Sequence, residues 1–118
     1  MKILLIEDEK EICKIYEEVL GSGGFNILSA YDGDSGYEIA KLGDWDILLL
    51  DIMLPNKDGI EILSQLNSLG LTKDRKVIIL SNIENSEVLN KSHSLGAIKY
   101  IVKSEIKPSE LLDIISSL

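Results

Sequence analysis

The sequence predicts an α/β fold built on a five-stranded parallel sheet, and three observations support that prediction. Five short apolar runs are spaced along the 118 residues, and segments with a helical spacing of apolar residues separate them. Four of the runs are nearly continuous rather than alternating, which is typical of strands covered on both faces in a parallel sheet. Strand and helix alternate five times along the chain, and this alternation favours one parallel sheet with helical crossover connections.

The expected strands are short and rich in Ile, Leu and Val. They cover residues 2–6, 25–30, 46–50, 76–80 and 98–102. The expected helices lie at residues 10–20, 34–42, 58–69 and 85–95, with a last helix that opens at the sequence KPSE, from residue 107. Glycines follow the first and third helices, and Pro108 suits the first turn of the last one. The helix at 85–95 contains five Asn or Ser residues, so its intrinsic helix propensity is low.

Length and charge limit the classes of protein that this chain can represent. A length of 118 residues fits a single domain, and we expect residues 1–118 to form one. The 20 acidic and 12 basic residues give a net charge of −8, which disfavours direct binding to nucleic acid or to anionic membranes. No segment resembles a signal peptide or a membrane span, and the single cysteine, Cys13, favours a reducing compartment. We therefore expect a cytoplasmic protein.

Polar residues stand at the ends of four of the expected strands. Glu7 and Asp8 follow the first strand, Asp51 the third, Ser81 the fourth and Lys103 the fifth. In open parallel sheets the working site lies beyond the carboxyl ends of the strands, so these residues are the candidates for function. If the first and third strands are neighbours, three carboxylates converge, and an all-oxygen cluster of this kind suits Mg²⁺.

The same residues also have a simpler interpretation. Acidic and polar residues are common after strands, where they form turns and cap helices, so Asp51 or Asp8 alone is more often a cap than a ligand. The combination is more specific. A bound Mg²⁺, the Lys103 ammonium and the Ser81 hydroxyl facing a carboxylate are the parts that phosphoryl transfer needs. The carboxylate itself can accept the phosphoryl group, because carboxylates form aspartyl-phosphate intermediates.

Four sequence motifs resemble those of a known family. They are LLIEDE at the first strand, LLLDIMLPNKDG at the third, IILSN at the fourth and LGAIKYIVK at the fifth. Together they make the chain similar to the receiver domain of bacterial two-component response regulators over essentially its whole length. This resemblance implies a flavodoxin-like, doubly wound five-stranded parallel sheet with strand order 2-1-3-4-5 and five helices.

The resemblance implies a role for each residue of the candidate site. Asp51 would be the phosphoacceptor. Glu7 and Asp8 would be the acidic pair that holds Mg²⁺, and the backbone carbonyl of Met53 would be a further metal ligand. Lys103 would contact the phosphoryl group.

Two residues would form the switch by the same resemblance. Ser81 fills the Thr/Ser switch position, and Tyr100 matches the aromatic residue that rotates inward when the hydroxyl engages the phosphoryl group. The surface formed by the fourth helix, the fifth strand and the fifth helix would change as a result. Asp58, after the third strand, would cap the third helix or hold the preceding loop.

The implied function is two-component signal transduction. A sensor histidine kinase or a histidine phosphotransfer protein would donate the phosphoryl group. The receiver would catalyse its own phosphorylation and slow dephosphorylation, and would not be a metabolic enzyme. The signal would pass to a downstream effector protein, to an output domain outside this chain, or through a phosphorylation-dependent homodimer. The alternative is a receiver-like interaction scaffold that is not phosphorylated.

Three residues depart from the usual pattern of the family. Ser104 follows Lys103 where proline is usual, and that Lys–Pro bond is usually cis. Because a cis bond without proline costs about 3–4 kcal/mol, we expect either a trans peptide with a rearranged loop or a tolerated strain. Ser81 replaces the commoner threonine and keeps the hydroxyl. Asn82 stands where a small alanine is frequent, and its bulk would alter the access of water to the phosphoryl site.

Overall fold

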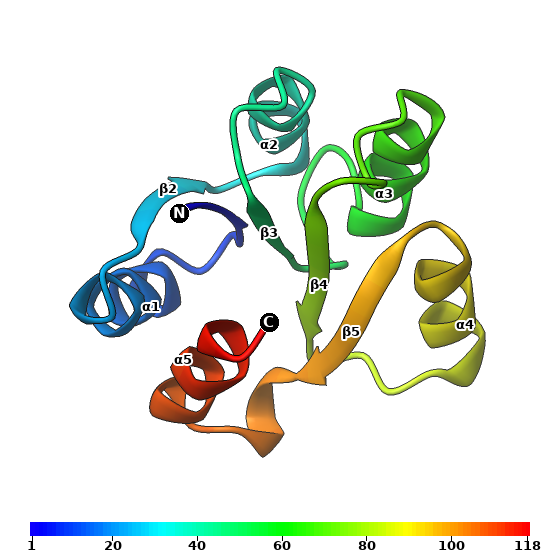
Figure 1. Ribbon diagram of the computed structural model, residues 1–118. Helices are drawn as coiled ribbons and strands as arrows, with labels where there is room; N and C mark the ends of the chain where they lie inside the picture. Colours follow the sequence, from blue (N-terminus) through cyan, green and yellow to red (C-terminus); the bar gives the residue numbers. More distant parts are fainter.

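The continuous apolar runs form a single sheet in which all strands are parallel (Figure 1). The computed structural model describes residues 1–118. The strands are β1 (Lys2–Ile6), β2 (Asn26–Ala30), β3 (Ile47–Leu50), β4 (Lys76–Ser81) and β5 (Ala97–Val102). Their order across the sheet is β2-β1-β3-β4-β5. The predicted doubly wound sheet with strand order 2-1-3-4-5 is therefore confirmed.

Five helices follow the strands and cover both faces of the sheet. They are α1 (Lys10–Ser22), α2 (Gly33–Ala40), α3 (Gly59–Ser68), α4 (Ser86–Ser94) and α5 (Pro108–Ser116). A short 3₁₀ turn, η1 (Lys103–Glu105), separates β5 from α5. Figure 1 shows α1 and α5 on one face of the sheet and α2, α3 and α4 on the other. Helix α1 continues through Gly21 to Ser22, two residues beyond its predicted end, and is capped by Gly23.

The hydrophobic core lies in two layers, one on each face of the sheet. Side chains alternate along a strand, so Ile3 and Leu5 of β1 pack with residues of α1 and α5, whereas Leu4 and Ile6 pack with residues of α2 and α3. All four side chains are buried. Coverage on both faces is the physical reason for the continuous apolar runs from which the strands were predicted.

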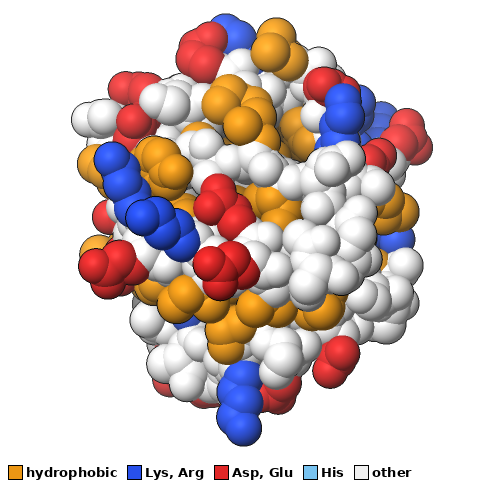
Figure 2. All heavy atoms as spheres, turned by 90° about the vertical axis from the view of Figure 1, so that its left-hand side faces the viewer, with side chains coloured by type: hydrophobic (Ala, Val, Ile, Leu, Met, Phe, Trp, Pro, Cys, Tyr) orange, Lys and Arg blue, Asp and Glu red, His pale blue; other side chains and the backbone are white.

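The surface of the molecule mixes charged and apolar side chains. Leu28 in β2 and Ile98 in β5 are exposed, because these two strands form the edges of the sheet. Figure 2 shows the side of the molecule that carries α1 and β2, where acidic and basic side chains alternate with exposed hydrophobic ones. No helix combines the length and the apolar composition that crossing a membrane requires.

The start of α3 is packed directly against the end of β3. The Gly59 N–H donates to the Ile52 carbonyl at 2.8 Å, and the Asp58 carboxylate caps the helix by accepting the Glu61 N–H at 2.9 Å. The predicted capping role of Asp58 is confirmed. A Cβ atom at Gly59 would overlap the backbone carbonyl of Asp51, so the approach requires glycine. These contacts fix the backbone on which Asp51 stands.

Helix α4 forms despite its low intrinsic propensity because both of its ends are capped. The Asn85 side chain accepts the N–H groups of Glu87 and Val88 at 2.9 and 3.2 Å. At the other end the chain turns at Gly96, whose φ of 111° suits glycine far better than other residues. The side-chain cap at the first turn offsets part of the cost of the Asn and Ser residues inside the helix.

Candidate functional site

The register of β1 and β3 brings the predicted acidic residues together. The two strands are neighbours, and Ile6 lies beside Leu50, so the next residues, Glu7 and Asp51, leave the sheet side by side. The Asp51 N–H donates to the Ile6 carbonyl at 3.1 Å and keeps the two chains together at this point. One carboxylate oxygen each from Glu7, Asp8 and Asp51 lie within 4.8 Å of one another.

The three carboxylates differ in their exposure. Glu7 is 1% exposed and Asp51 is 5% exposed, whereas Asp8 is open to solvent. Oδ1 of Asp51 accepts the Ile52 N–H at 2.7 Å, and Oε2 of Glu7 accepts the Glu9 N–H at 3.1 Å. Burying two carboxylates side by side is unfavourable unless a cation joins them, so the cluster needs a positive partner.

Lys103 is the positive partner. Its Nζ donates to Oε1 of Glu7 at 2.5 Å and to Oδ2 of Asp51 at 3.0 Å, and its side chain is almost fully buried. Burial on its own would lower the pKa of the ammonium, but the hydrogen bonds to Glu7 and Asp51 outweigh burial and raise it. Lys103 is therefore held in its charged form. The Lys103–Ser104 peptide bond is trans, which is the first of the two expected arrangements, and the chain continues into η1.

The Glu7 carboxyl is harder to ionise than an ordinary glutamic acid. Burial is the main cause of the raised pKa, and the charge of Asp51 adds to it, while the hydrogen bonds from Lys103 and the Glu9 N–H act in the opposite direction. The folded state therefore binds the Glu7 proton more tightly than the unfolded chain does.

This raised pKa predicts a pH dependence of stability in metal-free protein. Because the folded state holds the proton more tightly, the free energy of unfolding should fall as the pH rises from the ordinary value of 4.5 through the raised pKa of Glu7. Urea unfolding in EDTA at a series of pH values measures it. The Glu7→Gln variant should lack this part of the profile, and identical profiles for both proteins would contradict the assignment to Glu7.

Ser81 and Met53 line a pocket together with Asp8, Asp51 and Lys103, and this pocket has a volume of about 290 Å³. Ser81 ends β4 and is buried, and its hydroxyl accepts the Ile83 N–H at 3.4 Å. Met53 lines the pocket beside Asp51, with its side chain exposed. Tyr100 does not line the pocket: its ring packs against the core, and its hydroxyl donates to the Ile83 carbonyl at 2.5 Å.

Two hydrogen bonds at the site could not be predicted from the sequence. The Glu9 N–H holds one oxygen of Glu7, and the Asn82 side chain accepts the Ser104 N–H at 2.8 Å. A backbone donor cannot be recognised from residue type. The partner of Asn82 lies 22 residues away in the sequence, and only the folded loops bring the two together.

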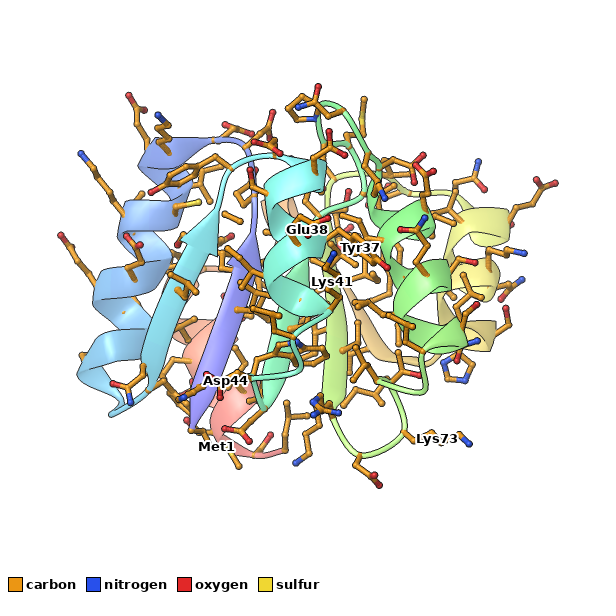
Figure 3. All side chains as sticks on the ribbon, turned by 90° about the horizontal axis from the view of Figure 1, so that it is seen from above. Met1, Tyr37, Glu38, Lys41, Asp44 and Lys73 are labelled. Atoms are coloured by element: carbon orange, nitrogen blue, oxygen red, sulfur yellow. The ribbon has the colours of Figure 1, made fainter.

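The amino ends of the strands carry a different set of side chains from the carboxyl ends. Met1, Asp44 and Lys73, labelled in Figure 3, precede β1, β3 and β4 and lie at the amino ends of these strands. Asp44 pairs there with Lys2 at 2.9 Å, and both side chains are more than half exposed. The only group of three or more potential ligands close enough together to hold a metal ion is the one at the carboxyl ends of the strands. Its oxygen-only donors fit a hard divalent cation such as Mg²⁺.

A doubly wound parallel sheet with acids and a lysine gathered at the carboxyl ends of its strands places the chain among the flavodoxin-like domains, a class in which ligands bind beyond these strand ends. Sequence comparison gives the particular family. Residues 3–116 match the response regulator receiver domain, and the chain belongs to this family.

Two bacterial relatives are named transcriptional regulatory proteins. The transcriptional regulatory protein DltR of Streptococcus agalactiae is 36% identical over 105 residues, which are 87% of this chain and 45% of DltR. CusR of Escherichia coli is 37% identical over 103 residues, 87% of this chain and 44% of CusR. The chain thus spans less than half the length of these relatives. The BeF3-activated N-terminal receiver domain of Klebsiella pneumoniae RstA has a TM-score of 0.86 and 27% identity, covering 99% of this chain and 97% of that one.

Proposed function

We propose that the chain is a phosphorylation switch in which Asp51 accepts a phosphoryl group in a Mg²⁺-dependent reaction. One observation carries the proposal: Asp51 shares a single pocket with Asp8, Ser81 and Lys103. A carboxylate nucleophile, further carboxylates, a fixed ammonium and a hydroxyl are the groups that phosphoryl transfer to an aspartate requires. Membership of the receiver family supports the same reaction.

The hydrogen bonds of Asp51 favour one of its oxygens as the nucleophile. Oδ1 accepts the backbone N–H of Ile52, whereas Oδ2 accepts a hydrogen bond only from a side chain, Nζ of Lys103. Oδ2 would attack the phosphorus atom, and the bond from phosphorus to the leaving group would break as the new O–P bond forms. The electron pair would leave with the donor. Lys103 would then transfer its hydrogen bond from the carboxylate to a phosphoryl oxygen.

Mg²⁺ would supply further neutralisation of the phosphoryl charge when it is bound. The residues that would hold it are Glu7, Asp8, Asp51 and the backbone carbonyl of Met53. Asp8 is the acid best able to exchange water for the ion, because it is exposed and lines the pocket. Glu7 would in addition keep Lys103 in place, through the hydrogen bond that it accepts from Nζ.

Ser81 and Tyr100 would change the conformation of the α4-β5-α5 surface when Asp51 is phosphorylated. The Ser81 hydroxyl lines the pocket and can donate to a phosphoryl oxygen, which would draw the loop after β4 toward Asp51. The Tyr100 hydroxyl already donates a hydrogen bond to the Ile83 carbonyl in that loop, so β5 would follow the movement. The α4-β5-α5 surface carries exposed Leu89 and Ile98, which a partner could cover.

The partners follow from the family and from the length of the relatives. The phosphoryl donor would be a sensor histidine kinase or a histidine phosphotransfer protein. Because DltR and CusR are more than twice as long as the part that this chain matches, residues 1–118 would act as one receiver domain toward an output domain or a separate effector. A phosphorylation-dependent homodimer would be a further candidate readout. The net charge of −8 disfavours direct binding of nucleic acid.

Intact mass spectrometry tests the reaction directly. After incubation with acetyl phosphate and Mg²⁺, the protein should gain the mass of one phosphoryl group, and EDTA should prevent the gain. Asp51→Asn should gain nothing. Asp44→Asn, an exposed aspartate at the opposite edge of the sheet, should react like the unaltered protein. No added mass in the unaltered protein would favour the unphosphorylated interaction scaffold instead. A gain that persists in Asp51→Asn would show that Asp51 is not the phosphoacceptor.

A further inference from the structure

The loops that follow β4 and β5 are joined by a hydrogen bond between two surface residues. Oδ1 of Asn82 accepts the backbone N–H of Ser104 at 2.8 Å. Both residues are exposed, so the contact is not a by-product of core packing. Both also occupy positions at which this chain departs from the family pattern described above. A proline at position 104 would have no N–H to donate, and an alanine at position 82 would have no oxygen to receive it.

The donor in this hydrogen bond belongs to the peptide that directly follows Lys103. An acceptor on that N–H fixes the orientation of the Lys103–Ser104 peptide plane and therefore the direction in which the Lys103 side chain leaves the backbone. The 3₁₀ turn η1, which begins at Lys103, has no side-chain cap of its own.

The position of Lys103 matters because its side chain must reach across the sheet. The strand order places β4 between β5 and β3, so about 10 Å of sheet separates β5 from the strand that carries Asp51. Nζ nevertheless bonds to Asp51 and, beyond it, to Glu7. A small rotation of the backbone at Lys103 would be amplified at the end of such an extended side chain.

A second contact holds the same loop. The Tyr100 hydroxyl donates to the carbonyl of Ile83, the residue after Asn82. Within the loop after β4, Ile83 is therefore hydrogen-bonded to β5, and Asn82 is hydrogen-bonded to the turn that follows β5. This arrangement makes Asn82 part of a fixed framework rather than a freely moving surface side chain.

We propose that Asn82 is a positioning residue that acts through Ser104 to hold Lys103 on Asp51 and Glu7, and thereby sets the rate at which Asp51 is phosphorylated. The rate effect rests on the proposed function, whereas the effect on the position of Lys103 does not. The loss of one hydrogen bond of this kind corresponds to about a fivefold change in an equilibrium constant or a rate constant.

The kinetic test compares two asparagines of the same loop. Asn82→Ala should slow phosphorylation by acetyl phosphate and Mg²⁺ about fivefold. Asn85→Ala removes the cap of α4 and should lower stability, but the rate should stay within about twofold of the original because Asn85 does not act on Lys103. A purely structural role for Asn82 would give the two variants the same behaviour. Equal rates for Asn82→Ala and the unaltered protein would overturn the proposal.

Two further measurements do not depend on phosphorylation. Hydrogen exchange at the Ser104 amide should become faster in Asn82→Ala and remain unchanged in Asn85→Ala. In metal-free protein, Asn82→Ala should shift the unfolding equilibrium about fivefold when Lys103 is present and less than about twofold in the Lys103→Met background. Additive effects of the two substitutions, or an unchanged Ser104 exchange rate, would overturn the positioning role even if the protein proved not to be phosphorylated.

Discussion

Replacing Lys103 by methionine is expected to lower the free energy of unfolding by about 3 kcal/mol at neutral pH in metal-free protein. Methionine keeps much of the volume of the side chain but removes the cation that bonds to both Glu7 and Asp51. Two buried carboxylates would then face each other without compensation. The loss should be smaller near pH 5, because Glu7, whose pKa is already raised, can take up a proton and relieve the repulsion. Urea unfolding at both pH values measures the effect.

Lys2→Met is the matched control for this prediction. Lys2 also pairs with an aspartate, Asp44, at 2.9 Å, but both side chains lie mostly in solvent. Exposed pairs contribute little, so this variant should lose no more than about 1 kcal/mol. The double variant Glu7→Gln, Lys103→Met should recover part of the lost stability, because one of the two negative charges is removed. Equal losses from Lys103→Met and Lys2→Met would show that the buried ion pair is not what stabilises the site.

Replacing Gly59 by alanine is expected to cost about 3 kcal/mol or more of stability. The added Cβ would overlap the backbone carbonyl of Asp51 and crowd the Cα of Ile52, and neither backbone group can move aside without shifting the end of β3. The Gly59 N–H would also lose its alignment with the Ile52 carbonyl. The same shift would displace the Asp51 carboxylate, so phosphorylation should slow in any fraction that remains folded. Thermal unfolding and the acetyl phosphate reaction measure the two effects.

Gly21→Ala, the same substitution at another glycine, is expected to have the opposite effect on stability. Gly21 lies within α1, and a Cβ there would meet nothing within 4 Å. Alanine should therefore raise the free energy of unfolding by about 0.5–1 kcal/mol, through its higher helix propensity. If Gly59→Ala were tolerated as well as Gly21→Ala, the close approach of α3 to the Asp51 backbone would be wrong.

The fold was predictable because its pattern repeats along the chain. Strands buried on both faces require continuous apolar runs, and each predicted run contains or overlaps a strand of the sheet. The end of α1 was predicted less well, because Gly21 and Ser22 have weak propensities and the contacts that extend the helix are not visible in the sequence. Helix α4 formed where propensity alone was unfavourable, since a single side chain, that of Asn85, caps its first turn.

The candidate site was predictable only to the level of strand ends. Once β1 and β3 are neighbours, Glu7 and Asp51 must approach each other, and the motifs resembling receiver domains pointed to that order. The path of the chain after Lys103 could not be predicted, because Ser104 allowed two arrangements of the peptide. The bond is trans, the form that a peptide without proline favours. The turn that follows is held by an acceptor from another loop, Asn82, and residue type does not show where that side chain lies.

The ion pair between Lys103 and Glu7 joins residues 96 positions apart, one just after the first strand and one just after the last. Four of the five strands can pair before β5 brings Lys103 to the site. Until then the acids at the carboxyl ends of the strands have no cation from the chain itself. The complete set of site residues therefore forms only once β5 has taken its place beside β4. A partly folded chain would present the acids without the lysine, so the complete set of reactive groups marks a chain that has finished folding.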